Sequence, residues 1–548
     1  MARRFEIIVT GTFVLLALSA RALGPHEIAL LVNGNSPDSR EIANHFARLR
    51  GVPVQNILLL DLPADFGGEQ SIITTQQFSQ LIWTPATNLL AKRGLDDHLL
   101  AWVYSSGFPA AVEYPKYVSL HGMTFLRGRL PPPDDIDKAR YSSPFFRGPV
   151  TPGGPQGSPL SLEQFAMALT TNYPLPAMTL GHVSPNGLTV AEILDSLRFS
   201  ARADATRPEA AVNFVLSDDV RSTCRSWQVP GASAELAKLG VKTLVTTNQP
   251  DRKQPLIGMQ VGAAVISDFL DAKLQPGCMA EHLTSFGAVF SGTGQSLITL
   301  WIKAGASASS GTVTEPYSLW PKFPHARFFV HYAAGCTMLE SFMQSLACPL
   351  QTFLLGDPLA RPYARARSLT LICLADDDAA ISGPAEFLAT EDNGIAPRDL
   401  TFFYLLDGRS VLTAGSGPHA KLGTENLDDG WHELRAVGYT PGTVRQQVFA
   451  TKFFGVRNHG RSVRIVSAGG SRIGAESPVE VKLEASGEPE RFELFAQGCE
   501  LASETNGTLK VNFGSVGPGP VWMQAVARYR DGGIARSKPQ TVEIIAHQ

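Results

Sequence analysis

In the amino-terminal part of the chain, apolar runs alternate with segments of helical character. Continuous apolar runs at residues 28–32, 57–62 and 99–104 predict strands that are buried on both faces. Segments 38–50 and 75–93 each end at a glycine and predict helices between these strands. Strands and helices that alternate in this way typically form a parallel sheet with helices on both faces.

The same alternation returns after a Pro/Gly-rich insertion near residues 122–159. A helix is expected at residues 232–239. Further strands are expected at residues 212–216, 241–246 and 352–355. We therefore expect a single α/β domain over residues 23–363.

The pattern changes beyond residue 363 to short strands separated by many turn residues. Residues 479–483 and 521–526 alternate apolar and polar side chains, which is typical of half-buried strands. A break near residue 459 divides this region in two. The sequence therefore predicts two all-β, immunoglobulin-like sandwich modules, at residues 364–458 and 459–548.

The first 22 residues have the features of a secretory signal peptide. Arg3 and Arg4 precede an apolar run at residues 7–18, and Ala20 and Ala22 supply the small residues of a cleavage site after Ala22. An uncleaved membrane anchor is the alternative, but a span needs about 20 apolar residues and this run is shorter. We expect an exported chain, in the periplasm, the cell envelope or the medium, with no transmembrane segment after cleavage.

Composition excludes several classes of function. The 47 basic and 50 acidic side chains give a formal net charge of −3, which offers no electrostatic footprint for nucleic acid. The six cysteines are scattered, without a CxxC pair or zinc-ligand spacing. We therefore expect no metal site and no cofactor, and cysteines that are mostly buried free thiols.

Polar residues after the first predicted strand are candidates for ligand binding. Asn33, Asn35, Ser36 and Asp38 lead into a helix, whose free N–H groups and positive dipole end favour an anion. The alternative is that Ser36 or Asp38 only caps the helix. Asp357 follows the last strand of the domain and could orient a ligand or a histidine, or belong to a structural turn.

A histidine in a glycine-flanked loop is the candidate general base. His282 is followed by Thr284 and Ser285, and its ordinary pKa lies near neutrality. The alternative is a structural histidine with satisfied hydrogen bonds. Thr284 and Ser285 are further candidates for ligand binding.

Small residues at 304–317 form the second half of this candidate site. They would let the backbone approach a ligand closely, as an oxyanion hole requires, and Ser307 or Ser309 could act as the nucleophile. Glu315 in this segment is a candidate ligand-binding residue. The alternative is a tight turn between packed elements.

The carboxyl ends of parallel strands meet at one edge of a sheet, where ligands bind. We therefore expect several of these side chains to share one polar crevice. They are Asn33, Ser36, His282, Ser307 and Asp357.

Six motifs together resemble an uncharacterised family of secreted bacterial proteins. They lie at residues 33–38, 104–109, 218–222, 281–287, 311–317 and 356–359. The resemblance covers most of the predicted α/β domain and implies membership of that family without implying an activity.

The chain is also faintly similar to the gingipain-type cysteine peptidases, which join a caspase-like α/β domain to an immunoglobulin-like domain. In that family a His-Gly and an Ala-Cys motif form the catalytic dyad. Here His282 is followed by Leu283, and Ala306 by Ser307 where the cysteine would stand. The resemblance implies a caspase/gingipain-like or Rossmann-like domain with a far weaker nucleophile than a thiolate.

Two functions remain open at this point. The first is a non-catalytic relative of such peptidases that binds a cell-surface protein or glycan. The second is a peptidase- or esterase-like envelope hydrolase that uses His282 with Ser307 or Ser309. The absent cysteine favours the first.

Overall fold

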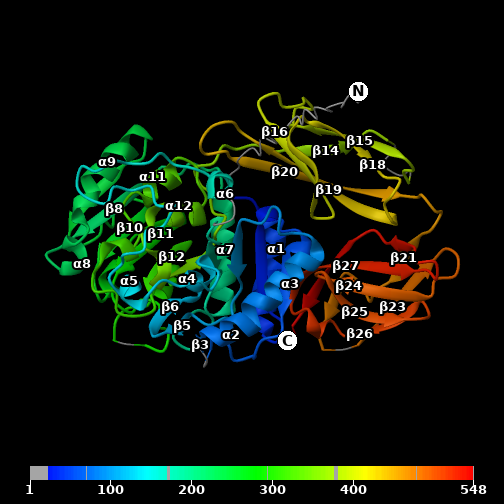
Figure 1. Cartoon of the computed structure of the whole chain (residues 1–548), viewed down its shortest axis with the longest axis horizontal. Coiled ribbons are helices and arrows are strands. Elements are labelled where there is room, and N and C mark those ends of the chain that lie inside the picture. The colour runs from blue at the N-terminus through cyan, green and yellow to red at the C-terminus, as the bar shows by residue number, and fades with distance from the viewer. Residues whose placement is uncertain are drawn as a thin grey trace, which may run out of the picture.

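The computed structural model describes residues 23–68, 71–169, 173–292, 294–375, 380–476 and 478–546, without the side chains of 412–415. The predicted signal peptide at residues 1–22 lies outside these ranges. Figure 1 shows an α/β region at the left and two β-rich modules stacked at the right. Among the described residues, no helix is long and apolar enough to cross a membrane.

A ten-stranded sheet forms the centre of the α/β region. In spatial order its strands are β2 (Ile57–Leu60), β1 (Ile28–Asn33), β4 (Ala101–Tyr104), β7 (Ala177–Thr179), β13 (Thr352–Gly356), β12 (Ala308–Thr312), β11 (Leu274–Leu283), β10 (Leu256–Gly262), β8 (Ala211–Leu216) and β9 (Thr243–Thr247). Most of these strands are buried on both faces, as their apolar runs predict.

The sheet is mixed, so the predicted all-parallel arrangement is wrong at the pair formed by β12 and β13. β13 runs antiparallel to β12, with Ala308 opposite Gly356 and Thr312 opposite Thr352. β11 and β12 run parallel, as do β10 and β11. Apolar runs specify that a strand is buried but not its direction, which is why the pattern missed this reversal.

Helices cover the sheet, and several match the predicted segments. α1 (Pro37–Arg50) begins where the side chain of Ser36 accepts a hydrogen bond from the backbone N–H of Ser39 and ends at Gly51, whose φ is 70°. The predicted helix at 75–93 is α2 (Thr75–Gln77), a π-helical stretch η3 (Phe78–Trp83) and α3 (Thr84–Arg93). The other helices named below are α6 (Leu162–Leu169), α7 (Val190–Ala203), α9 (Val229–Lys238), α10 (Thr299–Lys303), α11 (Phe328–Ala333) and α12 (Met338–Ser345).

The insertion predicted near residues 122–159 contains only short elements. A small sheet of β3 (Ile72–Thr74), β5 (Ala111–Tyr114) and β6 (Lys116–Ser119) precedes it, followed by α4 (Leu120–Phe125) and α5 (Pro133–Asp137). The end of the insertion is anchored on α12, where Gln344 accepts from the N–H of Leu160 at 2.8 Å and donates to its carbonyl at 2.8 Å. This contact holds α6 beside the core of the α/β region.

The carboxyl-terminal region consists of two β-rich modules. The first contains β14 (Thr370–Cys373), β15 (Pro384–Thr390), β16 (Thr401–Leu406), β17 (Arg409–Ser416), β18 (His419–Gly423), β19 (Asp429–Tyr439) and β20 (Gln447–Val456). The second contains β21 (Val463–Ser467), β22 (Arg472–Gly474), β23 (Val479–Ala485), β24 (Arg491–Ala496), β25 (Cys499–Glu504), β26 (Thr508–Val511), β27 (Gly519–Arg528), β28 (Ile534–Arg536) and β29 (Gln540–Ile545). β19 pairs with β28, so one sheet continues from the first module into the second.

Both modules pack on the α/β region. Asn44 of α1 donates to the carbonyls of Val516 and Pro518 at 2.9 and 2.8 Å, and its own side-chain oxygen accepts from Gln497 at 2.9 Å. From the first module, Arg435 donates to the carbonyl of Gly51 at 2.8 Å. The three parts of the chain therefore meet through polar contacts: α1 contacts the second module, and the glycine that ends α1 contacts the first.

Candidate functional site

His282 lies at the end of β11 with its side chain fully buried. Its Nε2 donates to the carbonyl of Ser296 at 3.0 Å, and its Nδ1 accepts from Nε1 of Trp301 at 3.0 Å. Burial lowers the pKa of His282 to about 4, with the hydrogen bond to Ser296 opposing that shift. The ring is therefore neutral, and both of its nitrogens are already used within the protein.

Ser307 and Ser309 have no contact with His282. Ser307 directly precedes β12, where its hydroxyl oxygen accepts from the N–H of Gly277 at 2.8 Å. Ser309 is buried within β12, and its hydroxyl has no hydrogen-bond partner among the described atoms. The predicted pairing of His282 with either serine is thus not formed in this structure, because protein groups already occupy the imidazole.

The predicted crevice is divided between two edges of the sheet. His282 lies at the carboxyl end of β11, and β11 runs parallel to β12. Ser307 lies at the other edge, because it precedes β12 rather than following it. Asp357 is also there, since β13 runs opposite to β12. The expectation that these residues gather at one edge is therefore wrong for Ser307 and Asp357.

Asp357 serves an ion pair instead of a ligand. Its fully buried carboxylate accepts from Nε of Arg50 at 2.9 Å and from the N–H of Leu359 at 3.0 Å. Arg50 also contacts Asp204 at 2.6 Å, and these two carboxylates hold the pKa of Arg50 above its usual value against the effect of burial. The end of α1 is thereby fixed to the sheet.

The polar residues that follow β1 organise their own loop. Asn33 donates to the carbonyls of Pro63 and Gly107, both at 3.0 Å, and its Oδ1 accepts from the N–H of Asn35. Asn35 donates to Asp61 at 2.7 Å. Ser36 caps α1, as the structural alternative proposed, and Asp38 lies half-buried in the first turn of that helix.

The remaining predicted residues also make local contacts. Thr284 donates to Oε1 of Gln295 at 2.5 Å, and the N–H of Ser285 donates to the same oxygen at 3.1 Å. The carboxylate of Glu315 accepts from the N–H of Tyr317 at 2.8 Å. These bonds explain the shapes of the two loops without a ligand.

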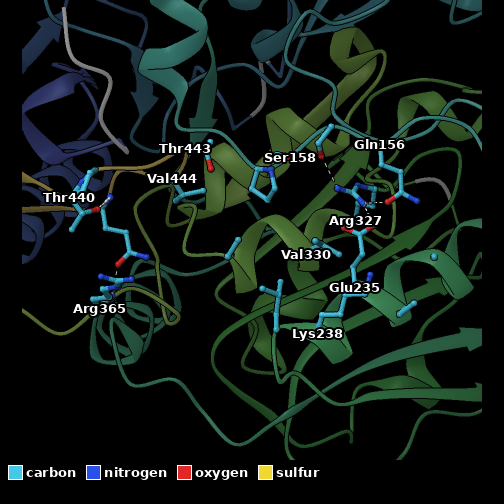
Figure 2. A pocket seen from close by; sticks show the side chains of 18 residues that line it. Gln156, Ser158, Glu235, Lys238, Arg327, Val330, Arg365, Thr440, Thr443 and Val444 are labelled. Atoms are coloured by element: carbon cyan, nitrogen blue, oxygen red, sulfur yellow. Dashed lines mark hydrogen bonds and ion pairs between the residues drawn. The ribbon is translucent and has the colours of Figure 1, made fainter.

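A pocket of about 780 Å³ lies elsewhere, between the α/β region and the first module. Its walls come from the insertion, α9, α11, the chain at Arg365 and the turn between β19 and β20. None of the side chains that the sequence singled out lines it. Figure 2 shows Arg365 and Thr440 on one side of the pocket, with Arg327, Glu235 and Lys238 on the other.

Basic side chains dominate the charge of this pocket. The lining includes Lys238, Arg327 and Arg365 against one carboxylate, that of Glu235. Lys238 and Arg365 are exposed and have no ion-pair partner among the described residues. Two cations that form no ion pair with another described residue therefore line the pocket, from different parts of the chain.

Arg327 is the fixed basic group of the pocket. Its residue is 2% exposed, and its guanidinium binds Glu235, Gln156 and, at 2.8 Å, the carbonyl of Gly157. Burial lowers the pKa of Arg327 from its usual value, and Glu235 opposes that shift. Its Nε, also buried, has no hydrogen-bond partner in the described structure.

Sequence reasoning missed this pocket because it considered only the ends of strands. A usable signal was present in the basic run Arg361, Arg365 and Arg367, which lies where the α/β pattern gives way to the β pattern. A cluster of basic residues at a domain junction favours an anion-binding surface between the domains. Within the described residues, no group of three or more His, Cys, Asp or Glu side chains could hold a metal ion.

Comparisons with known proteins give structural neighbours that are built of β-sandwich modules. No protein-family model and no curated protein matches the chain. The fibronectin(III)-like modules of Clostridium thermocellum CbhA are 15% identical, covering 32% of this chain and 94% of theirs, with a TM-score of 0.14. SGBP-B of the Bacteroides ovatus mixed-linkage glucan utilization locus, in complex with a mixed-linkage heptasaccharide, is 12% identical, covering 32% of this chain and 47% of its own, with a TM-score of 0.18.

The tandem Ig repeats of Dlar are another neighbour, 14% identical over 33% of this chain and all of theirs, with a TM-score of 0.15. These neighbours include immunoglobulin- and fibronectin-like modules. TM-scores this low support no conclusion about function.

Proposed function

We propose that this chain is an exported binding protein, and that the pocket between its α/β region and first module holds an acidic glycan of a cell surface. In this proposal the α/β region is a non-catalytic relative of the caspase/gingipain-like peptidases. The observation that supports it is that Lys238 and Arg365, which form no ion pair with another described residue, line one pocket from two parts of the chain.

The chemistry of the lining supports an anionic, hydroxyl-rich ligand. Lys238 and Arg365 supply charge, and Arg327 is already held in place by Glu235. Ser158, Gln156, Thr440, Thr443 and Gln446 add hydroxyl and amide groups that can both donate and accept hydrogen bonds. Sugar hydroxyls need partners of that kind, whereas carboxylate or sulfate groups on the glycan need the cations.

The state of the predicted catalytic residues supports binding over hydrolysis. A general base must have a free lone pair within hydrogen-bond reach of the nucleophile. The lone pair on Nδ1 of His282 accepts a hydrogen bond from Nε1 of Trp301, and the hydroxyl oxygen of Ser307 accepts one from the N–H of Gly277. Export rests on the signal-like residues 1–22.

The test compares binding of oligogalacturonate with binding of a neutral galactan of equal length, by calorimetry at low and moderate salt. We expect only the acidic oligosaccharide to bind, and more weakly as salt screens the charges. The double variant Lys238→Glu/Arg365→Glu should bind at least about tenfold more weakly, since attraction becomes repulsion on both walls.

The matched control reverses two exposed charges far from the pocket, Lys510→Glu and Arg530→Glu in the second module. This control changes the net charge by the same amount as the pocket variant, and its affinity for the acidic oligosaccharide should stay within about twofold of that of the unaltered protein. An acidic peptide that binds more tightly than any acidic glycan would replace the glycan by a protein partner. Equal loss in both double variants would remove the pocket from the proposal.

A further inference from the structure

The backbone nitrogen of Leu23 is buried against a carboxylate. Leu23 is 2% exposed, and its N–H donates to Oε1 of Glu340 at 3.0 Å. The same oxygen accepts from the N–H of Leu162 at 2.9 Å, while Oε2 accepts from the N–H of Thr337 at 2.8 Å. Glu340 thus joins the start of the described chain to α6 and to the first turn of α12.

Among the residues that the structure describes, Glu340 has no cationic partner. Its carboxylate is fully buried, and the groups that stabilise its charge are backbone N–H groups and Thr337. Burial raises the pKa of Glu340, against the effect of those hydrogen bonds. The charge of Glu340 affects the pKa of Arg361, but the ion pair that Arg361 forms in the described structure is with Asp204. A buried carboxylate without a counter-charge costs stability.

We propose that removal of the predicted signal peptide supplies the missing charge: the new α-ammonium group of Leu23 forms a buried ion pair with Glu340. In this step a signal peptidase hydrolyses the Ala22–Leu23 amide bond. Water adds its oxygen to the carbonyl carbon of Ala22, which leaves as a carboxylate. The nitrogen of Leu23 becomes an amine and takes up a proton at neutral pH.

The pair makes folding depend on processing. In the unprocessed chain the nitrogen of Leu23 is an amide with a single hydrogen and no charge. After cleavage it carries a full charge 3.0 Å from Glu340, at a site that excludes water. This inference goes beyond the pocket and does not depend on it.

The test compares two forms of the full processed chain, one that begins at Leu23 and one with Gly-Ser added before it. Urea unfolding should give the form that begins at Leu23 a folding equilibrium constant at least about tenfold larger than that of the form with Gly-Ser added. Glu340→Gln should remove that difference, because a neutral amide cannot pair with the ammonium. An unchanged difference in Glu340→Gln would overturn the proposal.

Glu192→Gln is the matched control. Glu192 closes the same type of capping box at the start of α7, where it accepts from the N–H of Thr189 at 2.8 Å. It lies away from Leu23, so its substitution should affect both forms equally. If it removed the difference as Glu340→Gln does, the effect would belong to helix capping in general.

A second measurement remains decisive if Glu340→Gln fails to fold. An amine-reactive ester should acylate the α-amino group of the native Leu23 form at least about tenfold more slowly than that of the urea-unfolded form, because the ammonium is buried and paired. Equal rates would overturn the proposal. So would an exported protein whose intact mass places its first residue elsewhere than Leu23.

Discussion

The α/β region and the first β-rich module bury histidines in opposite ways. In the α/β region, burial lowers the pKa of five histidines that are each at most 4% exposed. They are His121, His182, His282, His325 and His331. The module holds His432, which is 3% exposed but lies 2.7 Å from a carboxylate oxygen of Asp407. Burial lowers the pKa of His432, but Asp407 outweighs it and the net shift is upward.

Burial alone therefore does not decide whether a histidine becomes protonated as the pH falls. A buried imidazole without a carboxylate stays neutral, as His121 and His182 do with pKa values of about 3. With a carboxylate beside it, the charged form is favoured even when water is excluded. The two regions should therefore lose stability on opposite sides of neutrality.

The largest expected effect is acid destabilisation of the α/β region. Below pH 6.5 these five histidines bind protons in the unfolded chain but stay neutral in the folded protein. Each one therefore lowers the free energy of unfolding by up to about 1.4 kcal/mol per pH unit, until the pH reaches its pKa in the folded protein. His432 has the opposite sign: its contribution is complete below pH 6.5 and is lost as pH rises through its raised pKa. Hydrogen exchange between pH 7 and 5 should show faster opening of β1, β11 and α11 than of β19.

The matched variant is His432→Gln, which should weaken the module at pH 6 more than at pH 8. Earlier opening of the first module than of the α/β region at pH 5 would contradict the comparison. So would a stability of the whole chain that is independent of pH between 7 and 5.

The next effect concerns ion pairs, which also differ between the regions. The Arg50–Asp357 pair in the α/β region has side chains 7% and 0% exposed, whereas Asp531 in the Arg461–Asp531 pair of the second module is 63% exposed. Asp357→Asn should cost about 3–5 kcal/mol, because Arg50 is left with one partner in a buried site. Asp531→Asn should cost far less, because water screens the exposed carboxylate. Urea unfolding of both variants measures the contrast, and equal losses would refute it.

Sequence patterns predicted the parts of this molecule that depend on burial. The runs at residues 28–32, 57–62 and 352–355 are strands, and the glycines at 51 and 94 end helices as expected. All six cysteines are free, and four of them are buried. The patterns failed where direction and long-range pairing decide the outcome, because the reversal of β13 moves Asp357 to the edge opposite His282.

The candidate site was less predictable than the fold. His282 was recognised as a special position, but its partners Trp301 and the carbonyl of Ser296 could not be inferred from spacing. The pocket depends on Arg365 and on the turn at Thr443, which approach the insertion only after the modules pack on the α/β region. A site that is assembled between domains has no single motif to mark it.

The smallest expected effect contrasts two residues once expected to act together. His282→Ala removes the hydrogen bonds to Trp301 and Ser296 and should lower the free energy of unfolding by about 1–3 kcal/mol, since both buried partners are left unpaired. Ser309→Ala removes a buried hydroxyl that has no partner, so stability should stay within about 0.5 kcal/mol or rise. Differential scanning calorimetry of both variants gives the two values.

If the residues formed a catalytic pair, both substitutions would abolish turnover of ester or peptide substrates while leaving the melting temperature nearly unchanged. A marked loss of stability in Ser309→Ala would show that its hydroxyl has a partner in solution, and would remove the contrast between the two positions.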